Sequence, residues 1–162
     1  MAKEKFDIVE LVNNCGCFDL QFRKDTRRER VNSPTYYRWK AQFVVTAPEE
    51  NLKNLKKIRK KLGCGDIHIS KAGQARFSVQ KISDITGAVV PFCRRNALRG
   101  NKKKNFGLWA KGVEIIQKNK GKYLSGWKKN DLNCLMEIQK ACQKYKNNPR
   151  KAKWLDMAKA LT

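Results

Sequence analysis

Acidic residues, histidine and long hydrophobic runs are scarce in this sequence. Its 162 residues include 14 Asp and Glu against 37 Lys and Arg, and His68 is the single histidine. No apolar run reaches the roughly 20 residues that a transmembrane helix requires. The first residues hold acids instead of the apolar stretch of a secretory signal. These absences argue against a membrane partner and against a signal-directed secreted protein.

Six cysteines are present, but no two of them form a C-x-x-C pair. Cys15 and Cys17 are separated by one residue, and only one histidine could complete a ligand set. Structural zinc sites and disulfide frameworks have different spacings and contexts. We therefore expect reduced and mostly buried thiols, with no metal site and no cofactor.

The basic excess is spread along the whole chain and amounts to a formal net charge of +23, with an isoelectric point near 10.1. Repulsion on this scale opposes folding unless a polyanion relieves it, so the composition predicts a nucleic-acid partner. Hydrophobic residues make up 41% of the chain, which is enough for a folded core. The length predicts one domain, residues 1–162.

Hydrophobic periodicity and turn residues predict an α+β fold in the order α-β-β-α-β-β-α, followed by further helices. The expected helices occupy 4–14, about 47–62, 83–90, 105–118, 130–146 and 149–161, and the expected strands occupy 17–23, 36–46, 66–70 and 75–80. Pro91 is expected to break the third helix. The segments 24–34 and 93–104 are expected to be exposed basic loops.

The strands alternate between apolar and polar residues, which predicts one buried and one polar, cationic face. Phe18, Ile67, Ile69 and Phe77 are among the residues expected in the core. The opposite face would present amides and cations that suit base edges or phosphates. Its members are Gln21, Arg23, Arg38, Lys40, Gln42, His68, Arg76 and Gln80.

Three segments carry a resemblance to a known family. They are residues 8–18 (IVELVNNCGCF), 62–67 (LGCGDI) and 91–116, which combines Pro91-Phe92, a lysine run and an amphipathic helix. In order and spacing they resemble the LAGLIDADG homing endonucleases over residues 4–120. The resemblance implies a saddle-shaped, four-stranded antiparallel sheet backed by helices, with a core of about 4–120 and a C-terminal helical extension of about 127–162.

In this family a chain with one motif forms a homodimer through the motif helices. Here that resemblance places Val9, Glu10, Val12 and Asn13 at the interface. Glu10 would face its own copy across the two-fold axis and needs a compensating cation. Matched residue by residue, the metal-binding acid of the family falls on Cys15, and a second aspartate position falls on Asn13.

A thiol binds Mg²⁺ poorly, because Mg²⁺ prefers hard oxygen ligands. Cys15 and Asn13 are therefore interpreted as vestigial, with no catalytic residue, and the chain is expected not to be an enzyme. Mg²⁺ is expected as a cofactor only if the protein is instead an active endonuclease.

Basic clusters outside the strands are interpreted as phosphate contacts. The lysine run is also interpreted as the remnant of a lysine that assists catalysis in active family members. These clusters comprise Arg27, Arg28, Arg30, Arg94, Arg95, Lys102, Lys103 and Lys104.

Positive charge on many faces favours structured RNA over DNA as the ligand. The leading hypothesis is therefore a non-cleaving rRNA-binding component of an organellar ribosome. It would be mitochondrial, or alternatively chloroplast, with other ribosomal proteins as further partners. The alternatives are an active homodimeric DNA homing endonuclease, an intron maturase and a DNA-binding regulator.

Overall fold

The structure is a computed structural model and describes residues 7–26, 35–96 and 98–144. Its helices are α1 (Ile8–Cys15), α2 (Leu52–Leu62), α3 (Ile82–Asp84), α4 (Val90–Arg95), α5 (Gly100–Lys118) and α6 (Lys129–Gln143). Its strands are β1 (Gly16–Thr26), β2 (Thr35–Pro48), β3 (Asp66–Ile69) and β4 (Gln74–Val79). Short helical segments η1 (Glu49–Asn51), η2 (Ile85–Val89) and η3 (Leu124–Gly126) complete the described chain.

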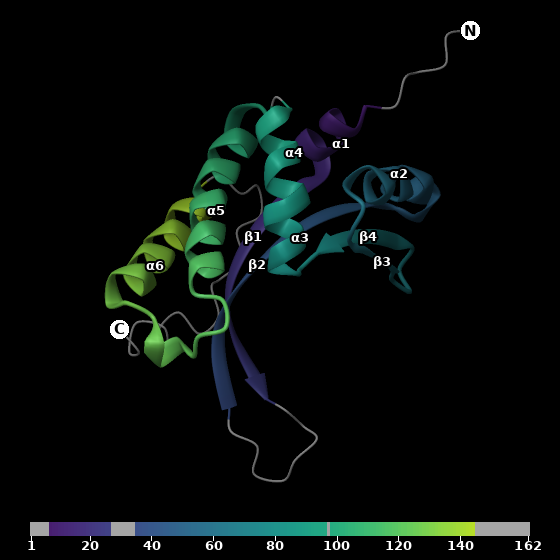
Figure 1. Cartoon of the computed structure of the whole chain (residues 1–162). Helices are drawn as coiled ribbons and strands as arrows, with labels where there is room; N and C mark the ends of the chain where they lie inside the picture. Colours follow the sequence, from purple (N-terminus) through teal and green to yellow (C-terminus); the bar gives the residue numbers. More distant parts are fainter. Residues whose placement is uncertain (1–6, 27–34, 97, 145–162) are drawn as a thin grey trace, which may run out of the picture.

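The four strands form one antiparallel sheet in the order β1-β2-β4-β3. The β1–β2 pair is the longest, and its far end extends beyond the rest of the sheet (Figure 1). The predicted α+β fold with a four-stranded antiparallel sheet backed by helices is confirmed. Both strands of this pair are longer than predicted, because they continue into the charged segment that we expected to be a loop.

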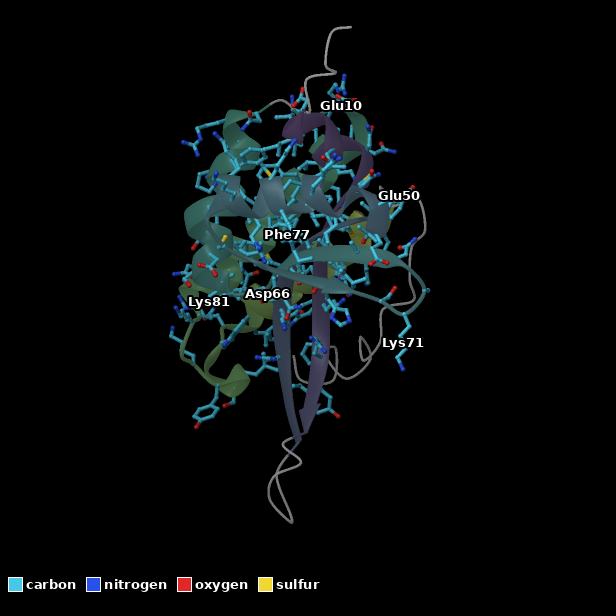
Figure 2. The ribbon with its side chains drawn as sticks, turned by 90° about the vertical axis from the view of Figure 1, so that its right-hand side faces the viewer. Glu10, Glu50, Asp66, Lys71, Phe77 and Lys81 are labelled. Atoms are coloured by element: carbon cyan, nitrogen blue, oxygen red, sulfur yellow. The ribbon has the colours of Figure 1, made fainter. Side chains whose placement is uncertain are left out.

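The core lies between one face of the sheet and the helices. Phe18, Phe43, Phe77 and Trp109 are fully buried there, together with Val12 of α1. Figure 2 places Phe77 inside the molecule, whereas Lys71 points outward from the turn between β3 and β4. The core residues of each strand occupy alternate positions and point to the same face of the sheet. The helices cover this face and leave the other face uncovered.

The passage from α1 into β1 is abrupt and sets the position of the motif. The side chain of Asp7 caps α1 by accepting from the Val9 N–H at 2.9 Å. Gly16 is extended rather than left-handed, so the helix runs directly into the strand. A Cβ at Gly16 would lie 2.5 Å from the Val12 carbonyl oxygen, which explains the glycine.

Helix α6 follows the αββαββα order and corresponds to the helix predicted over 130–146. It lies beside α5 (Figure 1). The Gln139 side chain reaches β1 and donates to the Leu20 carbonyl at 3.1 Å. The last predicted helix, 149–161, lies outside the described residues.

Three local predictions are wrong. Pro91 does not break a helix, because α3, η2 and α4 are continuous, and η2 is a π-helical turn in which the Val90 N–H bonds to Ile85. The segment 93–104 is not one continuous loop, since α4 runs to Arg95 and α5 begins at Gly100. Ile69 ends the edge strand β3 and is 40% exposed instead of buried.

No described helix has the length and hydropathy of a membrane span.

Candidate nucleic-acid interface

The face of the sheet that the helices leave uncovered gathers polar side chains from every strand. Arg23, Arg38, His68 and Arg76 are exposed on it, and the residue after β4, Gln80, is exposed as well. The strand register brings together residues that the sequence places up to 57 positions apart, from Arg23 to Gln80. We call this surface the strand face; it comprises Asp19, Gln21, Arg23, Arg38, Lys40, Gln42, His68, Arg76 and Gln80.

Two arginines lie opposite each other on the strand face. Arg23 of β1 and Arg38 of β2 are direct cross-strand partners, and His68 of β3 is the partner of Arg76 of β4. Directly opposite like charges destabilise an antiparallel pair. An anion bound on this surface would offset that repulsion.

Asp19 is the acid that sequence reasoning missed on this surface. Its Oδ2 accepts from Nε2 of Gln42 at 3.1 Å and also from Nε2 of Gln21. Gln42 is 7% exposed, so this amide is held in place instead of being free in solvent. The backbone carbonyl of Asp19 accepts from Trp109 Nε1 at 2.9 Å, which anchors β1 to α5 behind it. The alternation of β1 did indicate that Asp19 faces outward, but only the register pairs it with Gln42.

A second fixed contact joins the strand face across β2 and β4. Lys40 Nζ donates to Gln80 Oε1 at 2.6 Å. A hollow adjoins this contact and is lined by Arg38, Lys40 and Lys81 over apolar groups of Trp39 and Ile116. The hollow lies where β2 continues past the end of β4, so its cations extend the strand face toward α5.

The end of α1 carries the residues matched to the catalytic motif. Cys15 is exposed. The Asn13 amide donates to the Val9 carbonyl at 3.1 Å, and its Oδ1 accepts from the Arg99 N–H at 2.9 Å. Lys102 of α5 donates to the Gly16 carbonyl oxygen. The predicted lysine run is thus helical and reaches the end of the motif helix through Lys102.

The residues predicted at a dimer interface differ in accessibility. Val12 is fully buried in the core of its own chain. Val9 is half-buried and Glu10 is exposed, so these two are accessible to a second copy. Glu10 accepts a hydrogen bond from the guanidinium of Arg99 in the turn before α5. The cation that the sequence argument required is therefore an arginine of the same chain.

The other basic residues do not join the strand face. Arg94 and Arg95 lie at the end of α4, where Arg94 pairs with Glu114 of α5 at 3.2 Å. Lys103 and Lys104 are exposed on the first turns of α5. The predicted contacts Arg27, Arg28 and Arg30 lie outside the described residues.

Solved structures with the same fold are homing endonucleases. The crystal structure of I-TnaI superposes with a TM-score of 0.71 at 18% identity, over 96% of this chain and 95% of that one. I-SmaMI bound to uncleaved DNA in the presence of calcium ions has a TM-score of 0.72 at 17% identity, over 95% of this chain but 49% of that one. This chain therefore spans about half the length of I-SmaMI. No protein with a curated description matches the sequence.

The model of the LAGLIDADG endonuclease family matches residues 11–113, which is more than half of the chain. The matched family is one of endonucleases, and another I-SmaMI structure holds cleaved DNA. The sequence-based expectation that this protein is not an enzyme is therefore wrong, because it rested on the match of Cys15 to a motif acid, whereas the chain matches a family of endonucleases. The fold, the motif helix and the matched segment together establish that the chain belongs to the LAGLIDADG endonuclease family.

Proposed function

We propose that this protein binds a specific double-stranded DNA site on its strand face, as a homodimer, and acts on that DNA as an endonuclease of its family. The observation that carries the proposal is the Arg23–Arg38 pair, in which two exposed guanidinium groups lie opposite each other on the uncovered face of the sheet. Phosphate oxygens and guanine edges are the ligands that such groups bind best.

The amides of the strand face supply selectivity in this proposal. Gln21 and Gln42 are oriented by Asp19, and Gln80 is oriented by Lys40. An oriented amide can form the paired hydrogen bonds by which Gln recognises adenine in the major groove. Cations contribute affinity for any duplex, whereas fixed amides discriminate between base pairs.

The homodimer is supported by length and by the accessible face of α1. This chain covers nearly all of I-TnaI but only 49% of I-SmaMI, so two copies would supply what one I-SmaMI chain contains. Val9 and Glu10 are accessible on α1, and Arg99 neutralises Glu10. The two sheets of such a dimer, one from each copy, would then contact two half-sites related by two-fold symmetry.

The family uses divalent metal ions, but the described residues at the end of α1 do not fit one well. The side chains there are the Asn13 amide and the Cys15 thiol, and the Gly16 carbonyl accepts from Lys102. In the described ranges, no three His, Cys, Asp or Glu side chains form a metal-binding group. We therefore assign no catalytic step to a metal, and cleavage rests on family membership.

DNA takes the place of RNA as the proposed ligand because the similar structures that hold a nucleic acid hold DNA. The preference for RNA and the ribosomal partners stay predictions from the sequence. The Lys102 ammonium, which donates to the Gly16 carbonyl at the end of α1, is proposed to contact a phosphate of the DNA strand that passes the two-fold axis.

The experiment is selection of duplexes from a random library by the purified protein, followed by a cleavage assay on the selected site with Mg²⁺ or Mn²⁺. The proposal predicts enrichment of a site with approximate two-fold symmetry and strand cleavage near its centre. Selection of a site without cleavage would refute the endonuclease part, and the absence of any enriched sequence would refute the specific binding.

A further inference from the structure

The outer face of α2 carries a ridge of lysines that the strand face does not use. The helix has six basic residues and no acid in its sequence LKNLKKIRKKL. Lys53, Lys56, Lys57 and Lys60 follow the spacing i, i+3, i+4 and i+7, so they share one side of the helix. All four are exposed. We call them the α2 ridge.

The α2 ridge points away from the sheet. The opposite side of the helix holds Leu55 and Ile58, which are buried in the core with Phe77 of β4. Since α2 lies on the core side of the sheet, its outer face lies on the other side of the molecule from the strand face (Figure 1). A duplex bound on the strand face therefore does not reach the ridge.

Helix α2 contains no acidic residue that could pair with the lysines of the ridge within the helix. Glu49 and Glu50 precede α2 in η1, one turn before Lys53. No described ion pair joins Lys53, Lys56 or Lys60 to a carboxylate. Like charges at i, i+4 destabilise a helix. Repulsion among these lysines therefore destabilises α2, and a bound polyanion would offset it.

A hollow continues the ridge toward the motif helix. It is lined by Ile8 of α1 and by Lys57, Lys60 and Lys61 of α2. Three ammonium groups around an open hollow suit an anionic group of about phosphate size, because lysine binds phosphate as a point charge. The ridge has no aromatic residue on it, which argues against stacking of bases.

We infer that the α2 ridge binds the phosphate backbone of a second DNA duplex, so that the protein bridges two DNA segments. This inference rests on the proposed DNA-binding function of the strand face. From Lys53 to Lys60 the helix rises about 10 Å, and about 10 Å of duplex carries about six phosphates. Four lysines on this length can each contact one of these phosphates, and such contacts read no sequence.

Bridging is measured by immobilising the protein on a biotinylated duplex and then adding a fluorescent duplex of unrelated sequence. The wild type is expected to retain the second duplex, and the retained amount should fall steeply with added KCl. The variant Lys53→Gln, Lys56→Gln, Lys57→Gln, Lys60→Gln should retain at least about tenfold less. It should bind the first duplex as the wild type does.

The matched control is Lys120→Gln, Lys122→Gln, Lys128→Gln, Lys129→Gln, which removes the same charge from exposed residues of the α5–α6 connection and of the first position of α6. It should bridge normally. Glutamine and lysine have similar helix propensities, so the melting temperature checks that the ridge variant is folded.

Three outcomes would overturn the inference. They are undiminished bridging by the ridge variant, equal loss in both variants, and retention of a double-stranded RNA but not of a second DNA. Failure of the first duplex to bind at all would instead contradict the proposed function, since the first step depends on the strand face.

Discussion

Arg99 and Glu10 join the turn before α5 to the motif helix. The guanidinium donates to the Glu10 carboxylate, and the backbone N–H of the same arginine donates to Asn13 at 2.9 Å. The side chains of Arg99 and Glu10 are 65% and 50% exposed, so the pair contributes less than about 1 kcal/mol to the fold of one chain. In the proposed homodimer, this pair matters at the two-fold axis, where Glu10 would otherwise meet its own copy.

Replacing Arg99 by Ala should therefore weaken the homodimer more than the fold. We expect the dimer dissociation constant to rise roughly tenfold, about 1.4 kcal/mol, with the melting temperature of the chain nearly unchanged. The double variant Glu10→Gln, Arg99→Ala should recover most of the loss, because it removes the repelling carboxylates. Analytical ultracentrifugation measures both; equal weakening in the single and double variants would contradict this role for Arg99.

Asp19 places a negative charge in the middle of a cationic surface. Replacing Asp19 by Asn should raise the affinity for unrelated duplexes several-fold, because one repulsive charge facing the phosphates is lost. Discrimination for the selected site should fall, because the orientation of Gln21 and Gln42 depends on this carboxylate. Competition binding with specific and unrelated duplexes measures the ratio, and a variant with unchanged discrimination would show that these amides do not read bases.

Asp131 connects α6 to the end of α5. Hydrogen bonds from Lys118 at 2.9 Å and from Asn119 at 3.2 Å lower the pKa of its carboxyl, chiefly through Lys118. A lowered pKa in the folded state stabilises the protein above the unfolded-state value of about 3.9. This stabilisation is lost as the pH falls through the lower folded-state pKa.

Replacing Asp131 by Asn should accordingly destabilise the protein at pH 7 by about 1 kcal/mol, since Lys118 is 58% exposed and water screens the pair. The difference from the wild type should shrink as the pH falls below 4. Urea denaturation at several pH values measures it, and a difference that stays constant down to pH 2 would contradict the assignment.

The six cysteines differ in accessibility, and Cys15 reports on the motif helix. Cys15 and Cys134 are exposed, whereas Cys93 and Cys142 are buried, and burial raises the pKa of Cys93 to about 12. Thiol reagents should modify Cys15 and Cys134 first and reach Cys93 only after unfolding. Bound DNA should slow the reaction of Cys15 but not of Cys134, as measured by mass spectrometry; equal protection would argue against placing the end of α1 at the DNA.

Strand alternation predicted the strand face because alternation depends only on neighbouring residues. The polar positions of β1, β2 and β4 were therefore assigned correctly from the sequence. The contacts that fix the side chains were not, because Gln42 and Asp19 are 23 residues apart and Arg99 and Glu10 are 89 residues apart. Such pairs are set by register and packing, which periodicity does not contain.

The continuous helix through Pro91 was missed for a different reason. Proline lacks an N–H and its ring crowds the carbonyl four residues earlier, which predicts a break. The wider π-helical turn Ile85–Val89 lies just before it and accommodates the missing hydrogen bond, while Val90 and Phe92 remain buried. Burial of these two side chains stabilises the continuous helix, and this burial depends on packing against the rest of the fold.

Salt-dependent binding distinguishes a strand face that binds duplex DNA from one that does not. The affinity for a duplex should be titrated against KCl for the wild type, for Arg23→Gln, Arg38→Gln, Arg76→Gln, and for the control Lys120→Gln, Lys122→Gln, Lys129→Gln. The account predicts at least a hundredfold weaker binding for the arginine variant, with the log–log salt slope reduced by about 3, and a control close to the wild type. Equal effects in the two variants, or an arginine variant that binds as the wild type does, would contradict it.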